Sequence, residues 1–287
     1  MSESVTVSAP AKINLYLHVT GRRADGYHTL DSLIAFAGLG DQITVETADS
    51  LSLEIDGRFA ESLQNPDDNL VLKAARALAE EAGCPANAHI RLTKNLPVAA
   101  GIGGGSADAA AALKALAELW QISSDETAMQ SLAATLGADV PVCFAGHTAF
   151  VGGVGEVLTP APGLPSCGLV LVNPGVALAT PSVFAARTGD FGKEARFTET
   201  PANAADLAGL LSARRNDLAV AATALAPVIG DVLTALEAAG AHLARMSGSG
   251  ATCFGLFDDL SAAETAAEFL GLAAPDWWLA ATTLATP

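Results

Sequence analysis

The chain is poor in positive charge, and this excludes one large class of partner. Its 287 residues include 15 Lys and Arg against 31 Asp and Glu, a formal net charge of -16. Proteins that bind duplex nucleic acid depend on Lys and Arg to neutralise phosphates. We therefore expect no nucleic-acid partner, and any anionic ligand must be attracted by a local site rather than by the field of the whole protein.

Cysteine is scarce, and metal-binding spacings are missing. Cys84, Cys143, Cys167 and Cys253 are far apart and form no Cys-x-x-Cys pair. This pattern disfavours zinc and redox sites and favours buried free thiols in a reducing compartment. Apart from His28 the histidines are scattered, without His-x-x-His or His-Glu-x-x-His spacing, so we expect no metal site built from protein side chains.

Long apolar runs and a targeting segment are also missing. The longest run, from Leu218 to Ile229, contains Pro227 and is shorter than the roughly 20 residues that span a bilayer. No basic and hydrophobic leader opens the sequence. We therefore expect a cytoplasmic protein with no membrane partner. The hydrophobic content of 51% and the charged content of 16% indicate a folded chain.

Local patterns predict strands and helices that alternate without a regular βαβ rhythm, which favours an α+β fold over a doubly wound sheet. The expected strands cover 5–7, 12–19, 41–46, 89–92, 169–172, 242–246, 252–257 and 278–284. The expected helices cover 70–82, the segment from the glycine-rich turn to about 119, 125–136, 216–225 and 228–239. The loop that starts at Pro160 is rich in proline, so we expect domains at 1–160 and 161–287.

The most informative segment is glycine-rich and runs directly into an alanine-rich helix. Four of the five residues from Gly101 to Gly105 are glycine. Glycine lets a backbone approach a ligand closely, and the N–H groups of a helix N-terminus form an anion site. We therefore expect bound phosphate here. A turn needed only for packing is the alternative, and Ser106 as a helix cap is compatible with both.

Two well-known phosphate motifs do not fit this segment. The P-loop of NTPases ends in Lys-Ser or Lys-Thr, but here Gly105 is followed by Ser106 with no lysine. The dinucleotide pattern G-x-G-x-x-G fails at its third glycine, which is Ser106. Other segments must therefore decide which phosphate compound is bound.

Three further motifs accompany the glycine-rich segment: Pro10-Ala-Lys-Ile-Asn-Leu, Gly137-Ala-Asp-Val-Pro, and Met246-Ser-Gly-Ser-Gly-Ala-Thr-Cys-Phe. Together the four resemble the GHMP kinase superfamily of galacto-, homoserine, mevalonate and phosphomevalonate kinases, from about Ser8 to Phe257. The resemblance implies a two-domain α+β fold with an N-terminal domain like domain 2 of ribosomal protein S5 and a ferredoxin-like C-terminal domain. It also implies ATP as phosphoryl donor, with Mg²⁺ carried in by the nucleotide.

The acceptor is suggested by Arg23-Ala-Asp-Gly-Tyr-His-Thr-Leu. With Lys12-Ile-Asn-Leu, this segment resembles the branch of the superfamily that phosphorylates the 2-hydroxyl of a cytidine diphosphate-linked polyol in non-mevalonate isoprenoid biosynthesis. A kinase for a small acceptor such as homoserine or mevalonate is the nearest alternative, although those acceptors have no base to stack. A non-catalytic nucleotide-binding protein on the same fold is another. We expect a monomer or a weak homodimer.

The resemblance also implies two catalytic residues. Asp139 matches the aspartate that orients the acceptor hydroxyl and takes its proton, and Lys12 matches the active-site lysine. A cation at Lys12 could keep Asp139 ionised and neutralise charge on the transferring phosphoryl group. The alternatives are a turn-capping aspartate and a solvated lysine.

The binding residues follow from the same motifs. Those expected around the adenine and the phosphates of ATP are Asn69, Leu70, Lys94, Pro97, Ala99, Ala100, Gly101, Ile102, Gly103, Gly104, Gly105 and Ser106. Those expected to contact the acceptor are Asn14, Tyr27, His28, Thr180, Phe184, Gly248 and Gly250. The chain departs from the superfamily's usual Gly-Gly-Gly-Ser-Ser-Asn-Ala-Ala at Ala107 and Asp108, and we expect Asp108 to face away from the phosphates or to meet Mg²⁺ through water.

Overall fold

The computed structural model describes residues 4–63, 68–123 and 125–285, which divide into two compact units. The first unit comprises Met1–Ala11, Leu39–Val98 and Gly103–Gly146. The second comprises Lys12–Gly38, Ala99–Ile102 and His147–Pro287. The chain passes from one unit to the other inside the glycine-rich segment, so each side of that segment is held by its own unit. The domain boundary near Pro160 stays a prediction.

Two long strands run through both units. β1 (Ser4–Arg22) and β2 (His28–Glu46) pair with each other and are 19 residues each. The polar turn between them was expected, but the strands are longer than predicted, because Pro10 does not break β1 and β2 begins at His28. Among the described strands of the sheet, β1 pairs only with β2, and proline, which has no N–H to donate, is tolerated in such an edge strand.

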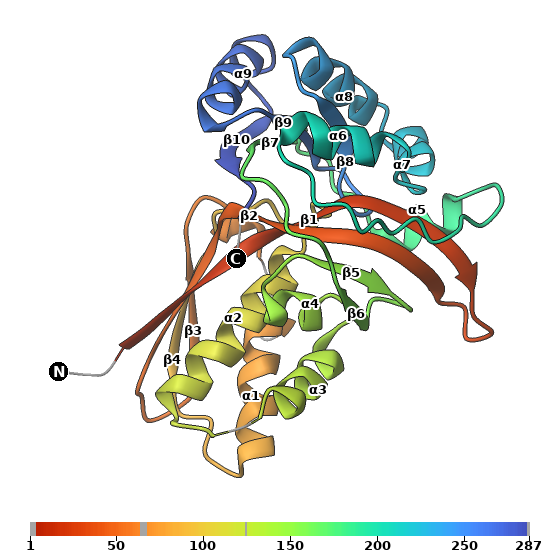
Figure 1. The fold of residues 1–287 in the computed structure, drawn as a ribbon. Helices are drawn as coiled ribbons and strands as arrows, with labels where there is room; N and C mark the ends of the chain where they lie inside the picture. The colour runs from red at the N-terminus through yellow and green to blue at the C-terminus, as the bar shows by residue number, and fades with distance from the viewer. Residues whose placement is uncertain (1–3, 64–67, 124, 286–287) are drawn as a thin grey trace. The chain divides into compact units, whose positions relative to one another are not determined.

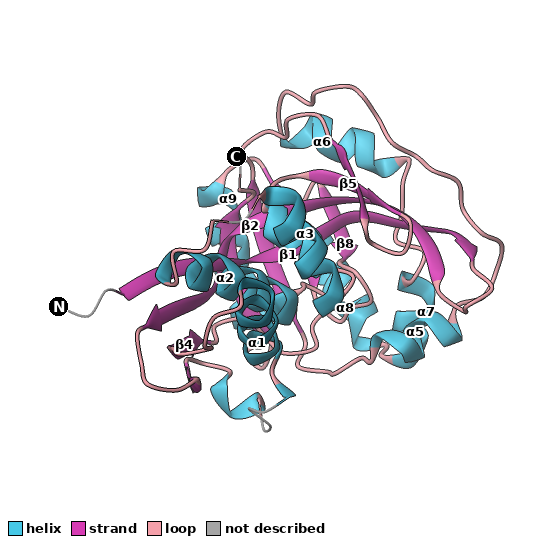
Figure 2. Cartoon of the chain, turned by 90° about the horizontal axis from the view of Figure 1, so that it is seen from below, coloured by secondary structure: helices cyan, strands magenta, loops and turns pink. Residues whose placement is uncertain are grey.

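The first unit joins part of a sheet to a layer of helices. β4 (His89–Thr93) is antiparallel to the end of β2 and parallel to β3 (Ser52–Asp56). The helical elements are η1 (Ala60–Ser62), α1 (Leu70–Ala82), α2 (Gly104–Leu119), α3 (Glu126–Leu136) and α4 (Val140–Ala145). α1 and α2 lie side by side (Figure 2). The buried face of α2 is mostly alanine, which lets the two helices approach closely.

The second unit contains a four-stranded antiparallel sheet in the order β10-β7-β9-β8. Its strands are β7 (Gly168–Asn173), β8 (Leu243–Met246), β9 (Cys253–Phe257) and β10 (Trp278–Thr283). α8 (Val228–Ala238) and α9 (Leu260–Ala273) pack on one face of this sheet (Figure 1), and Val172, Ile229 and Leu236 belong to the shared core. This order of strands and helices is the ferredoxin-like arrangement, which confirms the predicted α+β fold.

The remaining elements of the second unit are β5 (Ala149–Gly152), β6 (Val157–Pro160), α5 (Thr180–Ala186), α6 (Ala204–Ser212) and α7 (Ala219–Leu225). β5 pairs with the start of β2 and with β6. Of these elements only α7 was predicted, and its expected start at 216 was three residues early. β3 and α9 were not predicted either. Among the described residues no single helix is long and apolar enough to cross a bilayer; α7 and α8 pass such a test only as a pair, bent by 118°.

The cysteines follow the expected pattern with one exception. Cys143, Cys167 and Cys253 are buried free thiols, but Cys84 is only half-buried. Burial raises the pKa of the Cys167 and Cys253 thiols to about 12. Both therefore stay protonated at neutral pH and behave as small apolar side chains.

Candidate functional site

Three of the four motifs meet in the second unit around Gly101. The Ser247 hydroxyl donates a hydrogen bond to the Gly101 carbonyl (3.0 Å) and accepts one from the Asn14 N–H (3.1 Å). The Thr252 N–H donates to the Ala100 carbonyl (3.1 Å). Segments up to 233 residues apart in the chain therefore form one hydrogen-bonded assembly at the start of the glycine-rich turn.

Two glycines of this assembly cannot be replaced without steric conflict. Gly101 has φ 76°, and a Cβ there would lie 2.6 Å from the Ser247 carbonyl oxygen. Gly248 has φ 55°, and its Cβ would lie 2.7 Å from the Gly101 carbonyl oxygen. Only glycine combines a left-handed backbone with this closeness at little cost. Ala99, a non-glycine residue, also adopts a left-handed backbone, with φ 53°.

Lys12 and Asn14 lie side by side on the buried face of β1. The Lys12 ammonium donates to the Asn14 amide oxygen (2.8 Å), and the Asn14 amide donates to the Ser32 hydroxyl (2.8 Å). The Lys12 N–H also donates to the Ile102 carbonyl (2.9 Å). Lys12 is therefore a buried side chain joined to the glycine-rich turn, and the alternative of a solvated lysine is wrong.

Sequence reasoning missed Asn216, which holds the third motif in place. The buried Asn216 amide donates to the carbonyls of Met246 and Gly248, both at 2.8 Å, and its oxygen accepts from the Leu218 N–H. Thr180, predicted at the acceptor, pairs with the Ser249 hydroxyl (2.9 Å). A lone asparagine before a helix carries no sequence signal for this role, because all its partners but one lie about 30 residues away.

Two of the residues predicted to bind the base, His28 and Phe184, form an aromatic cluster with Phe191. The His28 and Phe184 rings are stacked, with centroids 5.0 Å apart and planes at 22°. Phe191 lies beside His28, with centroids 6.4 Å apart. Tyr27 is exposed, with 66% of its surface open to solvent. Burial, together with Arg22 and Arg187, lowers the pKa of His28, so the ring is neutral at physiological pH.

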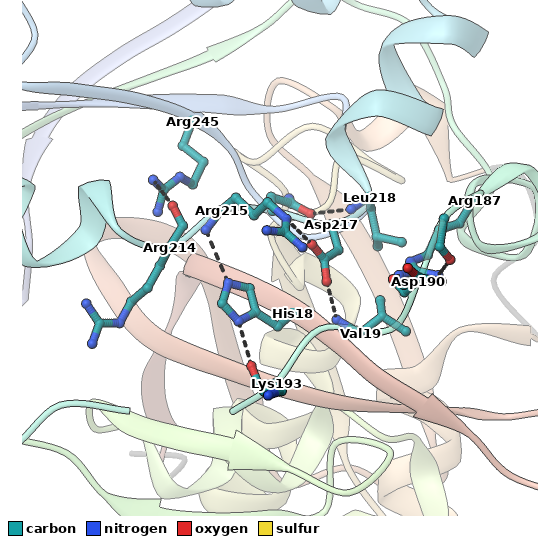
Figure 3. A network of polar contacts seen from close by, with 12 residues as sticks. His18, Val19, Arg187, Asp190, Lys193, Arg214, Arg215, Asp217, Leu218 and Arg245 are labelled. Atoms are coloured by element: carbon teal, nitrogen blue, oxygen red, sulfur yellow. Dashed lines mark hydrogen bonds and ion pairs between the residues drawn. The ribbon is translucent and has the colours of Figure 1, made fainter. Parts of the chain in front are cut away.

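Phe191 belongs to a strap, defined here as residues 187–203, that has no helix or strand and lies along β1 (Figure 3). The His18 ring contacts the Lys193 carbonyl through Nδ1 (3.0 Å) and accepts from the Arg215 N–H through Nε2 (3.3 Å). The Gly192 N–H donates to the Val19 carbonyl (2.8 Å). Because of these contacts, the strap keeps a fixed path past the aromatic cluster.

A buried carboxylate fixes the next part of the strap. Asp31, on β2, accepts hydrogen bonds from the Tyr16 hydroxyl (2.9 Å), the Ala195 N–H (2.8 Å) and the Arg196 guanidinium (2.9 Å). Burial and the nearby Asp31 charge raise the pKa of Tyr16. Tyr16 therefore stays a hydrogen-bond donor to the carboxylate.

In the first unit, the glycine-rich turn becomes the start of α2. Gly103, with φ 65°, is the residue before the helix, and no side chain caps this end. Ser106, which the sequence allows as a helix cap, lies inside the first turn and does not cap α2. Gly104, Gly105 and Ser106 form the first turn, whose N–H groups have no partner inside a helix and can bind an anion.

The residues predicted near the adenine have structural partners in the first unit. The Asn69 side chain accepts from the Val71 N–H (2.9 Å) and caps α1, which ends at Gly83 as predicted. Leu70 lies next to Gly105, with its methyl 3.8 Å from the position of a Cβ there. Lys94 is buried between Asp41 and Asp108. Asp108 is thus buried against Lys94, and its orientation relative to bound phosphates stays a prediction. Contact with adenine stays a prediction for Asn69, Leu70 and Lys94.

Asp139 comes directly before α4. Its side chain makes no capping hydrogen bond to that helix, so the alternative of a capping aspartate is not supported. Its pairing with Lys12 stays a prediction. Across residues 4–63, 68–123 and 125–285, no three His, Cys, Asp or Glu side chains gather as a metal-binding group. Mg²⁺ commonly reaches kinases on the nucleotide and needs only one or two protein carboxylates.

Comparison with known proteins agrees with this arrangement. The family model of the GHMP kinase N-terminal domain matches residues 69–147, and the family model of the GHMP kinase C-terminal domain matches residues 198–275. The 4-diphosphocytidyl-2-C-methyl-D-erythritol kinase of Paramagnetospirillum magneticum is 56% identical, with 96% of this chain and 97% of the relative covered. The kinase of the same name from Rhodospirillum rubrum is 52% identical, with 99% and 93% covered.

Solved structures show the same relationship. A crystal structure of 4-(cytidine 5'-diphospho)-2C-methyl-D-erythritol kinase is 38% identical with a TM-score of 0.80, covering 98% of this chain and all of that one. A homoserine kinase from Cytophaga hutchinsonii shares the fold, with a TM-score of 0.70 at 20% identity over 100% of this chain and 96% of that one. The chain therefore belongs to the GHMP kinases and, within them, to the 4-diphosphocytidyl-2-C-methyl-D-erythritol kinase family.

Proposed function

We propose that the chain transfers the γ-phosphoryl group of ATP to the 2-hydroxyl of 4-diphosphocytidyl-2-C-methyl-D-erythritol, a step in non-mevalonate isoprenoid biosynthesis. The observation that carries the proposal is the assembly around Gly101, where Asn14, Ser247 and Thr252 bring three motifs of the kinase superfamily into hydrogen-bond contact. Relatives at 52–56% identity bear the name of the kinase for this acceptor. A cytoplasmic location and a monomer or weak homodimer remain predictions.

The phosphates of ATP would be held by backbone rather than by side chains. The first turn of α2 offers N–H groups at Gly104, Gly105 and Ser106. At Gly101 the surrounding backbone leaves no room for a Cβ. Phosphoryl transfer needs little covalent chemistry from a protein and depends on positioning and charge stabilisation. Backbone N–H groups held by α2, and a turn held by the hydrogen bond from Ser247 to the Gly101 carbonyl, would supply positioning and charge stabilisation.

The cytosine would bind at the aromatic cluster. A flat base between two rings needs roughly 7 Å between them, twice an ordinary contact of about 3.5 Å, whereas the His28 and Phe184 centroids are 5.0 Å apart. We therefore propose that the base takes the place of the His28 ring against Phe184, with Tyr27 on its other face. The displaced imidazole would then hydrogen-bond the polar edge of the base. Stacking of this kind contributes about 1–3 kcal/mol per base.

In the proposed reaction, the acceptor oxygen forms a bond to the γ-phosphorus while the bond to the β,γ-bridging oxygen breaks. The products are ADP and the 2-phosphate, and the hydroxyl proton passes to Asp139. Lys12 would stabilise negative charge on the transferring group. Mg²⁺ bound to the nucleotide would neutralise phosphate charge.

An acceptor panel tests the proposal directly. The protein is incubated with MgATP and, separately, with 4-diphosphocytidyl-2-C-methyl-D-erythritol, mevalonate or homoserine; ADP is measured by a coupled assay and the product by phosphorus NMR. We expect turnover only with the cytidyl acceptor and a new phosphomonoester on its 2-oxygen. Turnover with mevalonate or homoserine alone would contradict the assignment of the acceptor.

Asp139→Asn separates catalysis from binding in the same assay. Loss of a positioned base should lower kcat by about 10²–10⁴ and change the KM for ATP only slightly, because Asp139 is assigned to the acceptor hydroxyl. Wild-type kcat in this variant would disprove the role of Asp139. A non-catalytic protein would bind ATP and turn over none of the acceptors.

A further inference from the structure

A buried ionic cluster, defined as Asp41, Lys94 and Asp108, lies in the first unit. The Lys94 ammonium donates to Asp41 Oδ2 (2.5 Å) and to Asp108 Oδ2 (2.7 Å). The side chains of all three residues are at most 4% exposed. Asp41 comes from β2, Lys94 follows β4, and Asp108 lies on α2. The cluster thus ties the helix that opens with the glycine-rich turn to the sheet beside it.

The two carboxylates of the cluster are not equivalent. Asp41 Oδ1 accepts from the N–H groups of Asn95 (2.6 Å) and Leu96 (2.8 Å), so both of its oxygens are bonded. Asp108 Oδ1 is buried and has no hydrogen-bond partner within the described part of the chain. A buried carboxylate oxygen without a partner carries a proton more readily than one with two N–H donors. Within the cluster, Asp108 is therefore the group that takes up or releases a proton.

The charges around Asp108 support this assignment. Burial raises the pKa of Asp108 to about 7, Lys94 acts against this shift, and Asp41 adds to it. The cluster has two acids and one base, so one proton on Asp108 makes it neutral.

The elements around Asp108 also carry other titratable groups. Asp56 of β3 accepts the Lys94 N–H only through its backbone carbonyl. α4 brings Cys143 and begins after Asp139, and Lys114 lies further along α2. The charged side chains of α1 are exposed: Lys73, Arg76, Glu80 and Glu81.

The cluster lies directly behind the expected phosphate site. A Cβ on Gly104, the first residue of α2, would be 3.1 Å from the Lys94 ammonium and 3.7 Å from Asp41 Oδ2. Asp108 follows four residues later, one helical turn away. Phosphates bound at this helix end would therefore repel a charged Asp108 across a short buried path, where charges are weakly screened.

We propose that Asp41, Lys94 and Asp108 form a positioning group behind the nucleotide phosphates, and that Asp108 takes up a proton from solvent when the nucleotide binds. The inference rests on the proposed function, since it needs phosphate at the start of α2. Negative charge on the ligand favours the neutral acid, and the proton in turn favours binding of the ligand. Lys94 then remains paired with Asp41 and holds Gly104 in place.

Calorimetry of MgADP binding tests the inference without turnover. The heat of binding is measured at pH 7.5 in two buffers of different ionisation enthalpy, and the difference gives the number of protons taken up. We expect about 0.3–0.5 proton per nucleotide for the wild type, falling toward zero at pH 5.5, where Asp108 is already protonated. Binding without proton uptake would overturn the inference and leave the proposed function intact; absence of nucleotide binding would overturn both.

Two variants assign the proton to Asp108. In Asp108→Asn the uptake should disappear, and the KM for ATP should stay flat from pH 6 to 8, where that of the wild type rises about three- to tenfold. Glu118→Gln removes the same charge from the exposed far end of α2 and should behave like the wild type. Equal uptake in Asp108→Asn and the wild type would refute the role of Asp108. If Asp108→Asn does not fold, the pH series on the wild type alone decides.

Discussion

Two buried polar regions flank the glycine-rich turn along the chain, and they are built from different chemistry. On the side of Gly101, the supports are hydroxyls and amides from Asn14, Ser247 and Asn216. On the side of Gly104, the support is the ionic cluster around Lys94. Both anchor backbone that is expected to hold phosphate, but the second contains Asp108, whose pKa burial raises to about 7.

The difference in chemistry predicts different roles for the two polar regions. Neutral hydrogen bonds contribute about 0.5–1.5 kcal/mol each and depend little on pH. A buried ionic cluster contributes little net stability, yet loss of one member leaves an uncompensated charge in the interior. We therefore expect the Gly101 side to set the shape of the turn and the Gly104 side to couple it to charge.

The largest expected effect comes from removing the cation of the ionic cluster. Lys94→Met leaves Asp41 and Asp108 buried without their ammonium, which should lower the free energy of unfolding by about 3–5 kcal/mol. Urea unfolding at pH 8 measures the loss. Lys73→Met is the matched control, because Lys73 forms an exposed pair with Asp68 and should change stability little. Equal losses in the two variants would contradict the importance of burial.

The second-largest effect is expected from replacing a glycine by alanine. We compare one glycine on each side of the glycine-rich turn. Gly101→Ala places a Cβ against backbone atoms at 2.6–2.7 Å in a left-handed conformation and should cost about 2–4 kcal/mol. In Gly104→Ala the nearest atom is the Lys94 ammonium at 3.1 Å, which has to give by only a few tenths of an ångström. Alanine also favours a helix over glycine, so we expect a change below about 1 kcal/mol. Thermal unfolding of both variants checks the order. A reversed order would mean that the Lys94 side is the more rigid one.

Parts of the molecule with local signals were predictable from the sequence. α1 was placed correctly because Asn69 and Gly83 mark its ends, and caps act within a few residues. The start of α2 followed from its glycines for the same reason. The sequence predicts two short strands, 5–7 and 12–19, where pairing with β2 gives one continuous strand, β1, that includes Pro10.

The supports of the site were not predictable in the same way. Lys94 was assigned to adenine by resemblance, but its partners Asp41 and Asp108 lie 53 and 14 residues away and show no pattern in sequence. The roles of Asn216 and of the strap at 187–203 were not predicted either, because their partners are also distant in the sequence. Charge pairs and amide contacts over such separations depend on how strands and helices pack, which local periodicity does not encode.

A smaller effect is expected from the neutral region. Ser247→Ala removes the hydroxyl that joins the Asn14 N–H to the Gly101 carbonyl in a fully buried position. Two unpaired backbone groups should cost about 1–3 kcal/mol, with the same loss at pH 6 and pH 8. Ser249→Ala is the control, because the Ser249 hydroxyl bonds the exposed Thr180 side chain, and it should lose less. A loss that changes with pH would show that this region is not neutral in function.

The smallest change in stability, counted per pH unit, is expected for Asp108→Asn. Its dependence on pH distinguishes the two polar regions most directly. Because burial raises the pKa of Asp108 to about 7, the folded state binds more protons than the unfolded state between about pH 4 and 7. Stability from this group is therefore full below pH 4 and decreases as the pH rises to 7. Asp108→Asn removes that slope, so its stability relative to the wild type should increase with pH by at most about 1.4 kcal/mol per unit. The increase should level off above pH 7. Urea unfolding of both proteins at each pH measures the difference, and parallel curves would show that Asp108 is ionised throughout, contrary to a proton held in the cluster.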